Sequence, residues 1–158
     1  MNADAVGLLV RRMRAADLEQ VMAIAASLKD APQWPRAAYV SALDKESTPR
    51  RIALVAEEPD GSAVTGFAIA SFLPPQAELE TIAVLAADQR RGIGRKLFFA
   101  LVEKLRAAEA REFLLEVRAS NQKALGFYRS LGWIEAGRRP RYYADPEEDA
   151  VLMKRPLE

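Results

Sequence analysis

The chain has 158 residues, which suits one domain with its own core, and half of those residues are hydrophobic. A formal net charge of +1 gives no general reason to expect binding to nucleic acid or to acidic membranes. Cysteine and histidine are both absent, which excludes a thiolate nucleophile, a histidine base and a Cys/His zinc site. Acid–base chemistry therefore depends on Asp, Glu, Lys, Tyr, a chain terminus or water, and we expect no metal.

The sequence also bears on location. It has no apolar stretch that approaches the roughly 18 residues of a membrane-spanning helix. Residues 1–10 lack the basic segment and long apolar core that mark a secretory signal. We therefore expect a cytoplasmic protein that does not associate with membranes.

The first half of the chain predicts two helices followed by a β-hairpin. The expected elements are helices at 17–28 and 36–43 and strands at 52–57 and 64–73. Asp17 is placed to be the N-cap of the first helix. Residues 30–35 contain two prolines, which predict a loop between the helices. Pro59-Asp60-Gly61 predicts the turn between the two strands.

The second half alternates between strands and helices. The expected elements are strands at 78–85, 113–118, 133–136 and 150–154, and helices at 95–109 and 121–131. Gly132 is placed to end the second of these helices. Strand–helix–strand order predicts a parallel strand pair joined by a crossover helix. Because no repeat or linker interrupts the pattern, we expect one α/β domain over residues 1–158, antiparallel in its early part.

Residues 89–94, Gln-Arg-Arg-Gly-Ile-Gly, form the most informative segment, between a predicted strand and an amphipathic helix. Glycine permits a tight turn close to a ligand, and the unpaired N–H groups at a helix N-terminus attract anions, most naturally a phosphate. A dinucleotide-binding Gly-x-Gly-x-x-Gly pattern is disfavoured because residue 97 is Leu and because the strand before the loop is not one at the N-terminus of the chain. The Gly-Lys-Ser/Thr of a P-loop is absent.

The same segment resembles the Gln/Arg-x-x-Gly-x-Gly/Ala loop of the GNAT family of acyl-CoA-dependent N-acetyltransferases. Residues 82–84 resemble the strand that leads into that loop, and 115–121, Leu-Glu-Val-Arg-Ala-Ser-Asn, resemble a more specific motif. Further similarity lies at Ala124, Tyr128, 130–133, 138–143 and 149–150. These segments resemble the bacterial subfamily that acetylates the N-terminal alanine of a small-subunit ribosomal protein. The resemblance is dense over about residues 79–155 and weaker before them.

The resemblance implies a fold, a co-substrate and a set of residue roles. The fold would be a mixed, mostly antiparallel sheet with one parallel strand pair, flanked by helices, and the co-substrate would be acetyl-CoA. Backbone groups of Ile82, Ala83 and Val84 would bind the pantetheine arm and the thioester carbonyl. Backbone N–H groups of the loop would hold the pyrophosphate, at Arg90, Arg91, Gly92, Ile93, Gly94 and Arg95. Asn121 would contact the coenzyme near its thiol.

The resemblance also implies that Glu116 is the general base and Tyr128 the general acid. An α-amine has a pKa of about 8 and must lose a proton to attack a thioester, so a partly desolvated glutamate is a suitable acceptor. A tyrosine hydroxyl can donate to the departing thiolate. Glu80 is a second candidate base, or a group that binds water or the amine. The structural alternatives are an ion pair of Glu116 with Arg118 or another cation, and core packing for Tyr128.

The acceptor is less closely specified. Trp34, Tyr142 and Tyr143 either line a peptide groove or belong to the core or rim, and the basic run at 138–141 is either a solvated face or a substrate contact. The partner expected from the resemblance is a protein N-terminus, with a ribosomal protein as the candidate. The alternatives are an acetyltransferase for a small amine or a lysine side chain, and a non-catalytic acyl-CoA-binding module.

Overall fold

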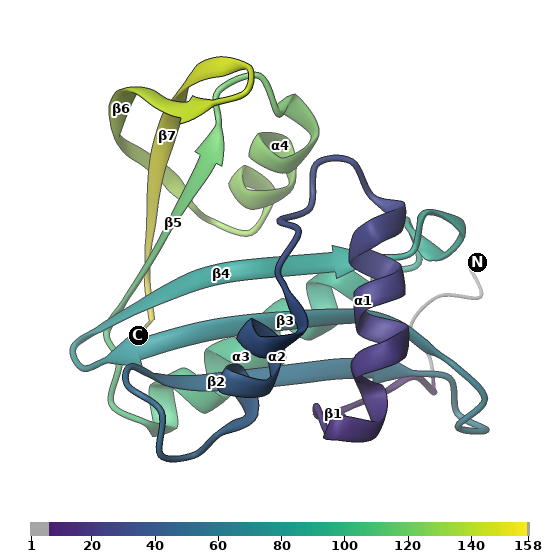
Figure 1. Ribbon diagram of the computed structural model, residues 1–158. Helices are drawn as coiled ribbons and strands as arrows, with labels where there is room; N and C mark the ends of the chain where they lie inside the picture. Colours follow the sequence, from purple (N-terminus) through teal and green to yellow (C-terminus); the bar gives the residue numbers. More distant parts are fainter. Residues whose placement is uncertain (1–6, 158) are drawn as a thin grey trace.

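Seven strands form one mixed sheet in the computed structural model, which describes residues 7–157 (Figure 1). The strands are β1 (Leu9–Arg12), β2 (Arg50–Glu57), β3 (Val64–Leu73), β4 (Gln76–Val84), β5 (Glu112–Arg118), β6 (Ile134–Ala144) and β7 (Glu147–Pro156). Their spatial order is β1-β2-β3-β4-β5-β7-β6. The β4–β5 pair is parallel and the other neighbouring pairs are antiparallel. The predicted mixed sheet with a parallel pair is therefore confirmed.

Helices cover both faces of the sheet. They are α1 (Leu18–Ser27), α2 (Arg36–Leu43), α3 (Ile93–Ala107) and α4 (Gln122–Ser130), with short 3₁₀ helices η1 (Ala15–Asp17) and η2 (Ala86–Asp88). In Figure 1, α1 and α2 lie in front of the sheet and α3 lies behind it. Each face buries its own apolar cluster, one under α1 and α2 and the other under α3 and α4. The crossover helix between β4 and β5 is α3, as the strand–helix–strand order predicts.

The parallel β4–β5 pairing is short. It joins Gln76–Glu78 to Glu112–Leu114, and the two strands then diverge (Figure 1). A β-bulge follows directly on β4, because Ile69 of β3 pairs with Thr81 while Ala70 pairs with Leu79, which leaves Glu80 as the extra residue. A bulge bends and twists its strand, so its position accounts for the divergence from β5.

Several element boundaries agree closely with the sequence pattern. The α2 helix and the β3 strand begin and end at the predicted residues, and the other predicted helices begin and end within two residues of prediction. Strand β1 was not predicted. Strand β6 is far longer than the expected 133–136, because the charged run that follows pairs with β7 through a register shift between Arg139 and Tyr143. Local sequence pattern cannot reveal such pairing, since the partner strand supplies it.

The expectation about a secretory signal concerned residues 1–10, of which 1–6 lie outside the part of the chain that the structure describes. Within residues 7–157, no helix has both the length and the apolar composition needed to cross a bilayer.

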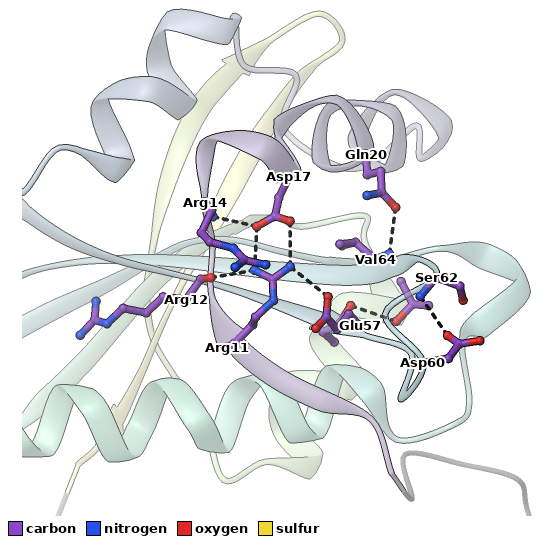
Figure 2. A network of polar contacts seen from close by, with 11 residues as sticks. Arg11, Arg12, Arg14, Asp17, Gln20, Glu57, Asp60, Ser62 and Val64 are labelled. Carbon is purple, nitrogen blue, oxygen red and sulfur yellow. Dashed lines mark hydrogen bonds and ion pairs between the residues drawn. The ribbon is translucent and has the colours of Figure 1, made fainter.

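Asp17 is the N-cap residue of α1, as predicted, but its side chain makes no capping hydrogen bond to that helix. Its carboxylate accepts hydrogen bonds from Arg11 at 2.8 Å and from the backbone N–H of Arg14 at 2.7 Å, and it makes no side-chain cap to α1. Figure 2 shows Arg11 between Asp17 and Glu57, and the Arg11–Glu57 distance is 3.0 Å. A buried carboxylate gains more from a guanidinium than from a backbone cap. The network joins β1, β2 and the start of α1.

Replacing Asp17 tests this network. The hydrogen bond from Arg11 lowers the pKa of Asp17 below its ordinary value of 3.8. A carboxylate with a lowered folded-state pKa stabilises the protein above its unfolded pKa, and that stabilisation is lost as pH falls through the folded value. Asp17→Asn should therefore lower the free energy of unfolding by about 2–3 kcal/mol at neutral pH, measured by urea titration.

The difference between Asp17→Asn and the parent protein should shrink below about pH 4, where the parent's Asp17 also takes up a proton. Glu19→Gln is the matched control, since Glu19 is exposed in its ion pair with Arg36 and should change stability by less than about 0.5 kcal/mol. Equal effects of the two substitutions, or a pH-independent loss for Asp17→Asn, would contradict this account of the network.

Candidate active site

A cleft of about 840 Å³ lies where β4 and β5 diverge. Its walls are the end of β4, the loop and first turn of α3 at 89–95, the start of α4, the open edge of β5, and residues 27–32 before α2. Beyond Glu78 the facing edges of β4 and β5 are not paired with each other, so their backbone groups can bind an extended ligand. The volume lies within the range of small-molecule sites.

One end of the cleft has the features of an anion-binding site. Gly92 has φ of 81° and is the N-cap of α3, a conformation that favours glycine, and its turn leaves the first N–H groups of the helix facing the cleft. Arg90 and Arg95 also line this end. Arg91 does not, because its guanidinium lies 3.0 Å from Glu58 and 2.7 Å from Asp88. The Arg91 side chain therefore anchors the loop, which leaves its backbone as the group predicted to bind phosphate.

The second glycine of the loop has a packing role. A Cβ atom on Gly94 would lie 3.2 Å from Cζ of Phe127 on α4, which is tighter than ordinary van der Waals contact. The first turn of α3 and the side of α4 therefore approach closely because residue 94 has no side chain. This contact fixes the separation of two walls of the cleft.

Asn121 has a defined orientation at the start of α4. Its Oδ1 accepts a hydrogen bond from the backbone N–H of Ala124 at 3.1 Å, so it is the N-cap of the helix. Because Oδ1 is engaged, the Nδ2 group is the donor that Asn121 offers to the cleft, which it lines.

The other end of the cleft carries carboxylates. Glu116 lies on the open face of β5 with its side chain 22% exposed, and its Oε1 is 3.3 Å from Nε of Arg139 on β6. A hydrogen bond to Glu116 raises the pKa of Tyr142, also on β6. Arg118 is not the partner of Glu116, since it pairs with Glu148 at 3.1 Å. The small buried Ala150 of β7 lies between Arg118 and Arg139 in register.

Two glutamates of β4, Glu78 and Glu80, lie near Glu116 of β5. Glu80 lines the cleft and is 2.8 Å from Nε of Arg51, so its charge is balanced. Burial raises the pKa of Glu78, and the charges of Glu116 and Glu80 raise it further. Two carboxylates, Glu80 and Glu116, therefore line one end of the cleft with Glu78 beside them, while Arg90 and Arg95 line the opposite end.

Tyr128 faces the cleft from α4. Its ring packs against Phe127 and Trp133, with ring centroids 5.5 Å and 5.8 Å away. Burial raises the pKa of its phenol, so the hydroxyl stays protonated at neutral pH and can donate a hydrogen bond. Core packing and a place in the cleft are thus compatible for this residue, because its ring contacts other aromatic rings while the residue remains partly exposed and lines the cleft.

Most of the candidate residues named from the sequence meet in this cleft. They are Glu80, Ile82, Ala83, Val84, Arg90, Gly92, Ile93, Gly94, Arg95, Glu116, Asn121, Tyr128 and Tyr143. Trp34 instead lines a separate recess of about 240 Å³ that includes Arg51, and Tyr142 lies outside the lining beside Glu116. The catalytic and binding roles of all these residues stay predictions.

Two residues that line the cleft from α4, Phe127 and Lys123, were not predicted from the sequence. Arg139, predicted only as part of the basic run at 138–141, is the cation that pairs with Glu116. Helical spacing from Asn121 would have placed Lys123 and Phe127 near Tyr128, whereas the Arg139–Glu116 pair depends on β-strand pairing that no local pattern shows. Within residues 7–157, no group of three or more acidic side chains is arranged to hold a metal ion.

Comparison with known proteins gives consistent matches. Residues 18–133 match the model of the Acetyltransferase (GNAT) family. The chain is 42% identical over 96 residues to the [ribosomal protein bS18]-alanine N-acetyltransferase of Salmonella typhimurium, a match that covers 60% of this chain and 65% of that enzyme. It is 37% identical to N-alpha-acetyltransferase RimI of Mycobacterium tuberculosis, with 98% of this chain and 96% of that protein covered.

Solved structures of acetyltransferases also superpose well on this chain. The ribosomal-protein-S18-alanine N-acetyltransferase from Escherichia coli superposes with a TM-score of 0.81 at 30% identity, covering 96% of this chain and 94% of that one. Naa20 from Chaetomium thermophilum, solved with a bisubstrate analogue, superposes with a TM-score of 0.80 at 27% identity, covering 94% and 86% of the two chains.

Substitution of Gly92, compared with that of a second glycine with positive φ, distinguishes an effect on ligand binding from the effect of backbone strain on stability. Gly92→Ala places a side chain at φ of 81° and should cost about 1 kcal/mol of stability, and it should weaken acetyl-CoA binding about 10-fold because the first N–H groups of α3 turn away. Gly61→Ala is the matched control, since Gly61 also has positive φ, 73°, and lies in an open turn. Calorimetry should show similar stability losses but weaker binding only for Gly92→Ala. Unchanged affinity would contradict the assignment of the anion end.

Proposed function

Because the chain belongs to the GNAT acetyltransferase family, we propose that it transfers the acetyl group of acetyl-CoA to the N-terminal α-amine of a protein. The names of its relatives make the N-terminal alanine of ribosomal protein bS18 the first acceptor to test. The observation that carries the proposal is the cleft itself, which has an anion-binding loop at one end and Glu116 with Tyr128 along its length.

The residues at the anion end fit acetyl-CoA. The backbone of the loop and the first turn of α3 would hold the pyrophosphate, with positive charge from Arg90 and Arg95. The open edge at 82–84 would pair with the amides of the pantetheine arm as an added strand does. Nδ2 of Asn121 would hold the arm from the opposite wall. When bound, acetyl-CoA supplies the thioester carbonyl that is attacked.

Glu116 would accept the proton of the acceptor amine. An α-amine is largely protonated at neutral pH, with a pKa of about 8, so attack on a carbonyl requires a base within reach, directly or through one water. Both carboxylates line the cleft and each has an arginine partner, but Arg51 lies 2.8 Å from Glu80 and is itself 20% exposed, whereas Arg139 lies 3.3 Å from Glu116 and is 57% exposed, so Glu116 is the less tightly held. This difference favours Glu116 over Glu80 as the base.

Tyr128 would donate a hydrogen bond or a proton to the departing thiolate. Its phenol stays protonated at neutral pH because burial raises its pKa. The departing thiolate, whose conjugate thiol has a pKa of about 8.5, is a weaker base than a phenolate, so a hydrogen bond suffices to stabilise the leaving group. The amine attacks directly in this scheme, and no covalent enzyme intermediate forms.

The choice of acceptor is tested by thiol release from acetyl-CoA with a panel of acceptors. Peptides that begin with Ala or Ser should be acetylated, with mass spectrometry placing the group on the α-amine. The same peptides with a blocked N-terminus, an internal lysine peptide and small amines should give rates at least about 10-fold lower. Turnover with small amines alone would overturn the proposal. Coenzyme binding without turnover on any acceptor would indicate a binding module.

Glu116→Gln tests the base. The substitution preserves shape but cannot accept a proton, so kcat/KM for an Ala-starting peptide should fall about 100-fold. Its remaining rate should follow only the fraction of unprotonated amine, and should therefore rise more steeply with pH than that of the parent enzyme. Glu135→Gln, which alters an exposed glutamate paired with Arg138, is the matched control and should leave the rate unchanged. An unchanged pH profile for Glu116→Gln would move the base to Glu80 or water.

A further inference from the structure

A lysine on α4 faces the phosphate loop from the opposite wall of the cleft. Lys123 lies in the first turn of α4, is exposed, and lines the cleft. Its Nζ donates a hydrogen bond to Oε1 of Gln89, the first residue of the loop. Gln89 in turn donates from Nε2 to the carbonyl of Val84 at 3.0 Å. These two bonds connect α4, the loop and the end of β4 across one end of the cleft.

The arginines near the loop belong to the loop and to α3, so Lys123 is the cation that approaches this end of the cleft from α4. Arg91 is occupied by Glu58 and Asp88, and its side chain does not line the cleft. Arg90 and Arg95 belong to the loop and to α3, so they approach a ligand from one wall. Lys123 brings a cation to the same end from α4. Its partner Gln89 is neutral, and an ammonium group binds an anionic oxygen more strongly than an amide oxygen.

We propose that Lys123 binds a phosphate group of the coenzyme, its ammonium group leaving the side-chain amide of Gln89 for a phosphate oxygen. The inference rests on the proposed function, since the ligand is taken to be acetyl-CoA. A phosphate seated on the N–H groups at the start of α3 lies next to Gln89, where Lys123 already points. Once Lys123 and the loop hold one ligand, that ligand joins α4 to α3 in place of the Gln89 bridge.

The position of Lys123 links coenzyme binding to the rest of the site. Asn121, which caps α4, lies two residues before Lys123, and Tyr128 lies five residues after it on the same helix. A phosphate held by Lys123 would therefore fix the helix that carries both residues. Lys123 would contribute affinity and position α4, while the loop would supply the main anion site.

The test is calorimetric titration of Lys123→Met and Lys123→Arg with three probes: CoA, dephospho-CoA and pantetheine. Lys123→Met should bind CoA about 5- to 20-fold more weakly than the parent, Lys123→Arg should bind it within about 3-fold, and both should bind pantetheine as the parent does. The deficit of Lys123→Met should shrink in high salt. Lys45→Met is the matched control, because Lys45 is exposed and outside the cleft, and it should change nothing.

The three probes also identify the phosphate. A deficit that is equal for CoA and dephospho-CoA assigns Lys123 to the pyrophosphate, and a deficit seen only with CoA assigns it to the 3′-phosphate. Unchanged CoA binding by Lys123→Met, or an equal loss with pantetheine, overturns the role of Lys123 while leaving the proposed function intact. Failure of the parent protein to bind CoA would overturn the proposed function as well.

Discussion

The short parallel pairing of β4 with β5 is the constraint on which the site depends. Three residues of β4 pair with three of β5, and the bulge at Glu80 then bends β4 away. The opening exposes two strand edges, and α3 and α4 begin beside it because each follows one of these strands. A continuous β4–β5 ladder would have satisfied the same backbone groups and left no room for a ligand.

The cleft is also polarised along its length. Helix N–H groups and cationic side chains lie at the loop, and Glu80 and Glu116 line the cleft where β4 and β5 separate, with Glu78 beside them. Both features come from strand geometry, since the loop follows the end of β4 and the glutamates lie on neighbouring strands. An anionic donor and a cationic amine would therefore enter from different ends. Arg51 and Arg139 balance the charges of Glu80 and Glu116 and limit the cost of holding the two carboxylates close together.

The sequence pattern was sufficient to predict elements whose structure depends on residues close together in the chain. Helix α2 and strand β3 follow from hydrophobic spacing, and Gly92 in the loop at 89–94 indicates the turn before α3. The sequence pattern did not predict features that depend on contacts between different elements. Asp17 sits where a helix cap is expected, yet Arg11 from the neighbouring strand takes its carboxylate. The length of β6 and the pairing of Glu116 with Arg139 depend on registers with β7, and a one-residue shift would remove that contact.

The most direct test of the central claim is amide hydrogen exchange with and without acetyl-CoA. If the opening between β4 and β5 is the donor site, the coenzyme will slow exchange at the open edge of β4 at 82–84 and at the loop and first turn of α3 at 90–95. Exchange in β1 and β2, at the far edge of the sheet, will stay the same. Unchanged exchange at 82–84 and 90–95, or slower exchange only elsewhere in the chain, would contradict the claim.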